Sequence, residues 1–295
     1  GRQLQLQTAK SRERMGALLE QLIVADVQRL RTDLVAGHQR QCQQQLVFNQ
    51  IDHVERSGES EHVVLALRVD CRSLLFTGDE LVTPGAPLKP GQIYNSNRYT
   101  LTGLVKGLGC ELIDLGIVPD TLEATETALE GAASIADVVI TSGGVSVGEA
   151  DYVKAAVEKL GRVEMWKVAM KPGKPLVYGR VGEADFIGLP GNPVSAFVTF
   201  CLFVRPFLLK RMGATDVLYR AFAVQADFAW SKPGARREFL RAQLQPSGRL
   251  ALFPNQSSGV LTSAVWGDGL VDNPAGSTIA HGDPVSYLSF ADLLA

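Results

Sequence analysis

The segment DVVITSGGVSVGEADYVKAAVEKL, residues 137–160, is the part of the sequence that decides the fold class. Its first residues, 137–141, form a short apolar and β-branched run that is typical of a buried strand. Its last residues, 151–160, have the spacing of an amphipathic helix, and glycines join the two. A strand, a glycine turn and a helix in this order predict an α/β domain whose ligands bind beyond the carboxyl ends of the strands.

The same alternation continues on both sides of this segment. Further strands are expected at residues 73–77, 110–115, 163–168, 176–178 and 185–188, and further helices at 96–108, 122–133 and 193–212. Lys210 and Arg211, followed by Gly213, mark the end of the last helix. We therefore expect residues 73–213 to form a three-layer domain in which helices cover a parallel sheet.

After residue 213 the apolar period changes to two. Strands at 221–226, 238–244, 250–253 and 285–288 predict a small C-terminal β domain over residues 214–295, either a barrel or a sandwich. Residues 1–72 differ from both parts because they are rich in glutamine and arginine. Apolar residues between Leu18 and Leu34 recur there at helical spacing, so this N-terminal segment is expected to be partly helical.

The composition excludes several classes of function. The chain has 295 residues, of which 46% are hydrophobic and 20% charged, and its net charge is -2. No global basic field is present for nucleic acid or an anionic membrane, and no apolar run reaches the roughly 20 residues of a membrane span. The cysteines form no CxxC pair, which argues against a zinc knuckle or a disulfide framework; they are Cys42, Cys71, Cys110 and Cys201. We expect a soluble cytoplasmic protein with small-molecule ligands.

The glycine turn at residues 140–148 is the first candidate site. Glycines without Cβ atoms let backbone N–H groups approach an anion at Gly143 and Gly144. Hydroxyl donors lie beside them at Thr141, Ser142 and Ser146. The turn is interpreted as a phosphate or pterin cradle, or as a tight connection between strand and helix that has no ligand.

Acidic residues follow the first strand of the same expected sheet. Asp79 and Glu80 would hold Mg²⁺ through water, since magnesium prefers carboxylate oxygens and keeps much of its hydration. The alternative is that Asp79 caps a helix. Asp151, at the start of the helix after the glycine turn, is either an N-cap or a ligand contact.

Two proline-glycine turns complete the set of candidates. In KPGKP, residues 171–175, Lys171 and Lys174 are held close together in a stiff corner that suits an oxyanion, unless they are solvated turn lysines. In LPGNPVS, residues 189–195, free backbone amides at a helix start predict an anion site, with capping by Asn192 as the alternative. The candidate residues of this second turn are Pro190, Gly191, Asn192 and Ser195.

Five motifs occur in one order that is similar to a known family. They are TGDEL at 77–81, GQIYNSN at 91–97, TSGGVSVGEADY at 141–152, MKPGKP at 170–175 and LPGNPVSA at 189–196. In this order and spacing they resemble the molybdopterin molybdenumtransferases, the lineage of bacterial MoeA and the gephyrin E domain. The resemblance covers about residues 74–290. It implies an enzyme of molybdenum cofactor biosynthesis that inserts molybdate into adenylated molybdopterin and releases AMP.

The resemblance also implies roles for particular residues. It assigns magnesium and pyrophosphate to Asp79, Glu80 and Asp151. It assigns the pterin phosphate to Thr141, Ser142, Gly143 and Gly144. It assigns molybdate to an oxyanion pocket formed by Lys171, Lys174, Arg236 and Ser257. These loops are therefore expected to form one positively biased pocket, in a protein that works as a homodimer and cooperates with other cofactor-biosynthesis proteins.

The sequence departs from the family pattern in two places. Asn95 stands where the family usually has aspartate in IYDSN, which removes one negative charge near the expected cation site. Residues 1–72 do not resemble the family's N-terminal domains, including their SAMDGYA-like stretch. Two alternatives to the transferase stay open: a molybdopterin-binding or scaffolding module without turnover, and a molybdopterin adenylyltransferase, against which the TSGGVSVG loop argues.

Overall fold

The computed structural model describes residues 72–77, 80–85, 87–144 and 152–295. Within these ranges, Phe203–Leu218 belongs to one compact unit, and Asp70–Leu202 with Tyr219–Ala295 form another. The N-terminal segment and three of the candidate residues, Asp79, Ser146 and Asp151, lie outside the described residues.

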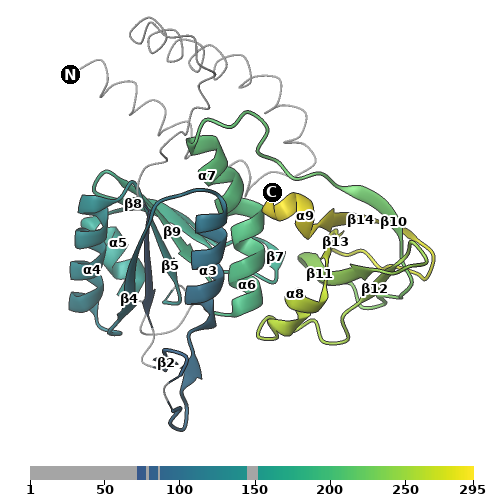
Figure 1. Cartoon of the computed structure of the whole chain (residues 1–295), viewed down its shortest axis with the longest axis horizontal. Helices are drawn as coiled ribbons and strands as arrows, with labels where there is room; N and C mark the ends of the chain where they lie inside the picture. The colour runs from purple at the N-terminus through teal and green to yellow at the C-terminus, as the bar shows by residue number, and fades with distance from the viewer. Residues whose placement is uncertain (1–71, 78–79, 86, 145–151) are drawn as a thin grey trace, which may run out of the picture. The chain divides into compact units, whose positions relative to one another are not determined.

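The first sheet of the larger unit has the strand order β4-β1-β5-β9-β8-β6 (Figure 1). Its strands are β1 (Arg72–Thr77), β4 (Leu112–Val118), β5 (Val138–Ser142), β6 (Gly161–Trp166), β8 (Val177–Val181) and β9 (Ala184–Leu189). The four strands β4, β1, β5 and β9 are parallel. The α/β class is therefore confirmed.

The two remaining strands correct the expectation of a wholly parallel sheet. Strand β8 pairs with β9 antiparallel, and β6 pairs with β8 antiparallel. Only Gly182 and Glu183 separate β8 from β9. A connection of two residues makes a hairpin, whereas parallel neighbours need a crossover of a dozen residues or more.

Helices cover both faces of this sheet, which gives the expected three layers (Figure 1). One face carries α4 (Leu122–Ile135) and α5 (Tyr152–Leu160), and the other carries α3 (Ser96–Gly107) and α6 (Pro193–Thr199). Apolar side chains at helical spacing on α4 and α5 pack against the sheet in one core. They are Leu129, Ala132, Val153, Ala156 and Val157.

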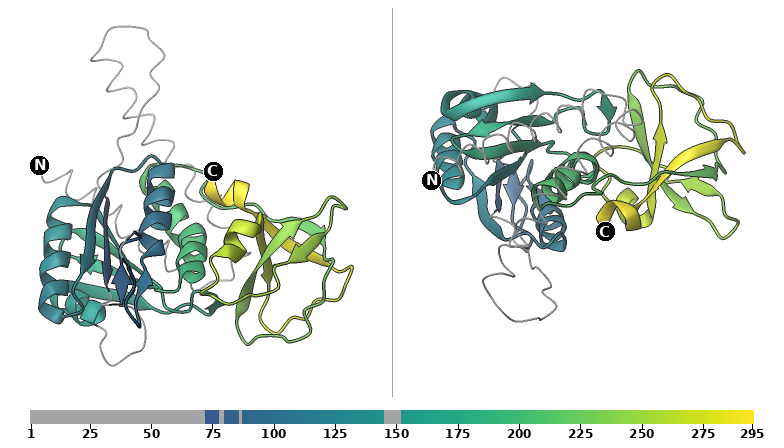
Figure 2. Two further views of the ribbon diagram at one scale, coloured as in Figure 1. Left: turned by 60° about the horizontal axis from the view of Figure 1, so that its bottom comes forward. Right: turned by 90° about the horizontal axis from the view of Figure 1, so that it is seen from above.

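The second sheet, drawn in green to yellow in Figure 2, has five antiparallel strands in the order β10-β14-β13-β11-β12. Its strands are β10 (Phe222–Gln225), β11 (Arg237–Leu244), β12 (Leu250–Leu252), β13 (Gly269–Asn273) and β14 (Pro284–Ser289). Ala226, directly after β10, bridges to Leu250 of β12, so the two edges meet and the sheet closes as a small barrel. The short helices α8 (Thr262–Trp266) and α9 (Phe290–Leu294) complete this part.

Three strands that the sequence did not indicate are important for the site. Strand β7 (Met170–Lys171) pairs parallel with β11 and so joins the lysine corner to the second sheet. Strands β2 (Leu81–Val82) and β3 (Ile93–Tyr94) form a separate parallel pair. Strands of two residues are too short to show a period, which is why they were missed.

The expected helix at 193–212 consists of three segments. They are α6, the π-helical η1 (Phe200–Val204) and α7 (Arg205–Arg211). Pro206 has no N–H for an i→i−4 hydrogen bond, and its ring would crowd the carbonyl of Leu202 in a regular α-helix, so the π-helical segment precedes a residue that disfavours a regular α-helix. By length and composition Pro193–Arg211 could cross a membrane, but 83% of its apolar window is buried in the structure, as in a core helix.

Candidate ligand-binding site

A pocket of about 620 Å³ lies at the carboxyl ends of β1, β5 and β9. The strand register explains its position, because Phe76, Ser142 and Leu189 lie side by side as strand partners and the chain turns directly after them. Its volume falls within the range of about 300 to 1,000 Å³ that is usual for small-molecule sites. Eight of the predicted site residues line this pocket: Glu80, Ser142, Gly143, Gly144, Pro190, Gly191, Asn192 and Ser195.

The glycines of the turn after β5 allow an unusually close approach of backbone segments. Gly143 has φ +97° and Gly144 has φ +65°, which are conformations that favour glycine. A Cβ on Gly143 would lie 2.6 Å from the carbonyl oxygen of Thr77, and a Cβ on Gly144 would lie 2.7 Å from the Thr77 hydroxyl. The N–H of Gly143 donates to the carbonyl of Leu189 at 3.2 Å. This amide extends the sheet and does not point freely at a ligand.

A hydrogen-bond network joins the three loops that form the pocket. The Ser142 hydroxyl donates to the carbonyl of Pro190 at 3.1 Å and accepts from Asn97 Nδ2 at 2.8 Å. The same Asn97 Nδ2 also donates to the carbonyl of Gly191 at 2.8 Å. Asn97 therefore ties the start of α3 to the ends of β5 and β9, and Ser142 helps to position the loops. Thr141 is fully buried and does not line the pocket.

Three buried polar atoms around this pocket have no hydrogen-bond partner. They are Thr77 Oγ1, Asn95 Nδ2 and Asn97 Oδ1, on residues that are 3%, 2% and 8% exposed. Buried polar groups in proteins are usually paired, and unpaired ones are often explained by a ligand or by water. Sequence reasoning missed Thr77 and Asn97, although the position of each next to a strand end or helix start was available as a signal.

The charged residues that line the described part of the pocket are both acids. Glu80 follows β1, and Asp120, which sequence reasoning also missed, follows β4. The expectation of a positively biased pocket is therefore not met by its lining residues. The described residues contain no group of three His, Cys, Asp or Glu side chains able to hold a metal.

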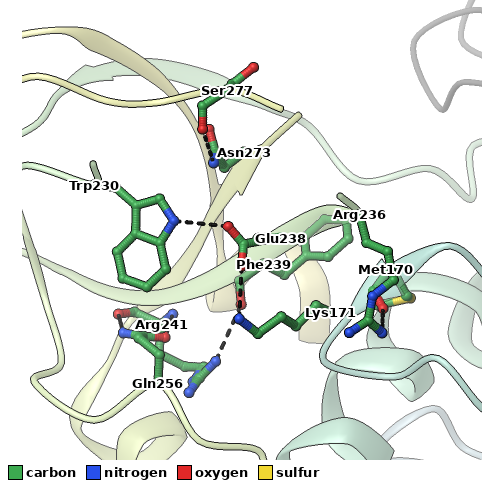
Figure 3. Close-up of polar contacts among 10 residues, drawn as sticks. All are labelled: Met170, Lys171, Trp230, Arg236, Glu238, Phe239, Arg241, Gln256, Asn273 and Ser277. Carbon is green, nitrogen blue, oxygen red and sulfur yellow. Dashed lines mark hydrogen bonds and ion pairs between the residues drawn. The ribbon is translucent and has the colours of Figure 1, made fainter. Parts of the chain in front are cut away.

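The lysine corner lies next to the pocket but outside its lining. Pro175 lines the pocket, whereas Lys171 and Lys174 do not. Lys171 Nζ donates to Glu238 Oε1 at 3.0 Å, and Trp230 Nε1 donates to Glu238 Oε2 at 2.8 Å (Figure 3). The side chain of Lys171 is 52% exposed and that of Glu238 only 2%. A lysine predicted to bind an oxyanion is thus already neutralised by a buried carboxylate on β11.

Arg236 and Ser257 have structural contacts of their own. Arg236 Nη1 donates to the carbonyl of Met170 at 2.9 Å, which brings it to the lysine corner (Figure 3). The carbonyl of Ser257 accepts from Arg241 Nη2 at 3.2 Å. Burial lowers the pKa of Arg241 to about 10, because the guanidinium is desolvated among neutral acceptors. The structure therefore brings Arg236 to Lys171, while Ser257 lies two residues from Gly259, which lines the pocket.

The turn at the start of α6 is held by the second sheet's loops. The N–H of Val194 donates to the carbonyl of Ser258 at 3.0 Å, so one of the free amides expected there is already paired. Asn192 makes no side-chain capping hydrogen bond. Its capping role, considered above as an alternative, is not supported, and its side chain lines the pocket.

Comparisons with known proteins agree with this architecture. Residues 73–210 match the family model described as a probable molybdopterin binding domain, and residues 223–290 match the MoeA C-terminal region, domain IV. A molybdopterin molybdenumtransferase of Haemophilus influenzae is 56% identical over 140 residues, 48% of this chain and 35% of that protein. One from Nostoc sp. is 38% identical over 226 residues, 73% of this chain and 52% of that protein.

A solved structure is also similar. The crystal structure of a molybdopterin biosynthesis MoeA protein from Pyrococcus horikoshii has a TM-score of 0.65 at 32% identity, and covers 75% of this chain and 54% of that one. The chain belongs to the MoeA and gephyrin E-domain family. It spans about half the length, or less, of the curated relatives that it matches.

Asn95 stands where the sequence resemblance predicts an aspartate. Its Oδ1 accepts from the N–H of Arg98 at 3.1 Å and caps α3, a role that the family's aspartate can perform equally well. The difference lies at the second polar atom, which is an amide donor here.

Proposed function

We propose that this chain acts in molybdenum cofactor biosynthesis, where it inserts molybdate into adenylated molybdopterin and AMP is released. One observation carries the proposal: segments far apart in the sequence, at the ends of β1, β5 and β9 and the starts of α3 and α6, line a single pocket. This pocket belongs to the part that matches a molybdopterin binding domain. The curated relatives named molybdopterin molybdenumtransferase support the same reaction.

The pocket and the lysine corner would each bind a different substrate. In the proposal the pocket holds the organic substrate, and Lys171, Lys174, Arg236 and Ser257 hold molybdate beside it. Molybdate and the phosphates are all anionic, so fixed positive groups must offset their repulsion before the substrate's sulfurs replace oxo groups. Lys171 would exchange Glu238 for the oxyanion, since its side chain is half exposed and can move.

Magnesium is proposed at the acidic side of the pocket. Glu80 and Asp120 both line it, and carboxylate oxygens are the protein ligands that magnesium prefers. Magnesium bound there would supply positive charge to the substrate's pyrophosphate. We propose Asp79 and Asp151 as further members of this group.

The remaining parts of the proposal concern the protein as a whole. We propose a cytoplasmic homodimer that takes small-molecule substrates and exchanges them with other proteins of the pathway. The curated relatives are named for a biosynthetic activity, which supports this setting.

The experiment is a measurement of AMP release by the full chain, supplied with molybdopterin-adenylate, molybdate and Mg²⁺. Replacing both Lys171 and Lys174 by methionine should lower molybdate-dependent release about 100-fold, by analogy with the loss of a charge-stabilising donor. Both lysines are exposed, but removing Lys171 leaves the buried Glu238 without its cation, so thermal unfolding of the double variant is measured beside release. The matched control is Lys159→Met, an exposed lysine paired with Glu126 on α4, away from the site.

Each outcome decides between the candidate functions. Unchanged release in the double variant removes the lysines from the proposal. Tight binding of molybdopterin-adenylate without release by the unaltered chain supports the binding module, the second candidate. Formation of molybdopterin-adenylate from molybdopterin and ATP would instead indicate an adenylyltransferase.

A further inference from the structure

Two asparagines at the start of α3 bring unpaired polar atoms to the pocket. Asn95 is the N-cap of the helix, and Asn97 lies in its first turn. Both are more than nine-tenths buried, both line the pocket, and each has one polar atom without a partner. An amide atom that is buried without a hydrogen-bond partner is desolvated at a cost, which a group that pairs with it would recover.

The orientation of the Asn95 amide follows from its partner. Its Oδ1 accepts from the N–H of Arg98 at 3.1 Å. A backbone N–H can only donate, so the oxygen must face the helix and the nitrogen must face the other way. The unpaired atom, Nδ2, is therefore a hydrogen-bond donor.

In the Asn97 amide it is the nitrogen, not the oxygen, that faces the protein partner. Its Nδ2 lies 2.8 Å from the carbonyl of Gly191 and donates to it. A carbonyl can only accept, so the nitrogen must face Gly191 and the oxygen the other side. The unpaired atom, Oδ1, is an acceptor. The two pocket-lining asparagines thus carry one fixed donor and one fixed acceptor, both buried and unpaired.

This pair selects against phosphate and molybdate. Their oxygens could pair with Asn95 Nδ2 but would repel Asn97 Oδ1. A complementary group needs an acceptor and an N–H donor on one neutral edge. Amino-substituted nitrogen heterocycles have such an edge, because a ring nitrogen that accepts lies next to an exocyclic amino group.

We infer that Asn95 Nδ2 and Asn97 Oδ1 form a subsite that binds the amino-substituted edge of a heteroaromatic ring. The inference rests on the proposed function, because adenylated molybdopterin carries two such rings, pterin and adenine. Thr77 Oγ1, also unpaired, can donate or accept and adds a third contact. An aspartate at this position, as the sequence resemblance predicts, would offer acceptors only, so Asn95 is the residue that supplies the donor and determines specificity.

The test measures binding of three separate probes, pterin, adenosine and inorganic phosphate, to the full chain by titration calorimetry. Asn95→Ser and Asn95→Asp both keep a side-chain oxygen that caps α3 and both remove the amide donor. Each should weaken binding of one of the two rings about tenfold, and Asn95→Ser should leave phosphate binding unchanged. The control is Gln225→Glu, which makes the same amide-to-acid change on an exposed residue of β10.

The probes and variants separate the possible outcomes. A loss confined to pterin identifies the pterin ring as the occupant, and a loss confined to adenosine identifies adenine. Equal ring binding by Asn95→Ser and the unaltered chain overturns the subsite, as does a defect in Asn95→Asp alone, which would be an effect of charge. AMP release is measured separately: ring binding that depends on Asn95 without any release overturns the proposed function and leaves the subsite standing.

Discussion

The pocket at the strand ends has unpaired polar atoms, whereas the lysine corner on β7 has paired ones. Around the pocket, Thr77, Asn95 and Asn97 each keep a buried polar atom without a partner. At the corner, the ammonium of Lys171 is paired with Glu238, whose second oxygen is held by Trp230. The first region is ready for a ligand, whereas the second must exchange a protein partner for one.

The two regions should therefore respond differently to mutation. In the pocket, binding depends on loops that fit tightly, so steric changes should have large effects. At the corner, binding depends on competition between a carboxylate and an oxyanion for one lysine, so changes of charge should alter affinity in either direction. Three substitutions test whether the two regions differ in this way.

The largest effect is expected for Gly143→Ala. The new Cβ would lie 2.6 Å from the backbone oxygen of Thr77, and φ at this position is +97°. Strain and overpacking together should lower the free energy of unfolding by about 3 kcal/mol. Gly248→Ala is the matched control, because Gly248 has φ +77° and nothing within 4 Å, so only about 1 kcal/mol should be lost. Equal urea midpoints for the two variants would contradict the tight fit.

A smaller effect is expected for Glu238→Gln, which should strengthen oxyanion binding. Glutamine can still accept from Trp230, but it no longer neutralises Lys171, so affinity for tungstate or molybdate should rise about threefold at low salt. Titration of the oxyanion measures this. Glu126→Gln is the control, since Glu126 is also a mostly buried acid paired with an exposed lysine, Lys159, but lies outside the site. Unchanged affinity in Glu238→Gln would show that Lys171 does not bind the oxyanion.

The smallest effect on stability is expected for Asn192→Ala. Asn192 makes no capping hydrogen bond at the start of α6, so the free energy of unfolding should fall by less than about 0.5 kcal/mol. At the start of α4, Thr121 Oγ1 accepts from the N–H of Ala124 at 3.3 Å, and Thr121→Ala should cost about 1 kcal/mol. Thermal unfolding of both variants checks the order. A larger loss in Asn192→Ala would return Asn192 to a structural role.

Periodicity located most of the larger elements because each has its own local pattern. The strand at 137–141 and the helix at 151–160 were predicted within a residue or so of β5 and α5. Strand β13 was missed because both of its faces are buried and its residues show no alternation. The antiparallel course of β8 was missed because it depends on a two-residue connection, not on the strand's own residues.

For the site, the sequence was enough to predict which loops meet, because strands of one parallel sheet end at a common edge and glycine, proline and asparagine mark the turns there. Which atoms of those loops are unpaired follows from the packing of the folded chain. Lys171 is paired with Glu238 across 67 positions, and Asn97 with Gly191 across 94. Such pairings arise when distant segments are packed side by side, and no local pattern of residue types encodes them. The residue types at the edge of the sheet can be recognised from the sequence, but the fold sets which of their polar atoms are hydrogen-bonded.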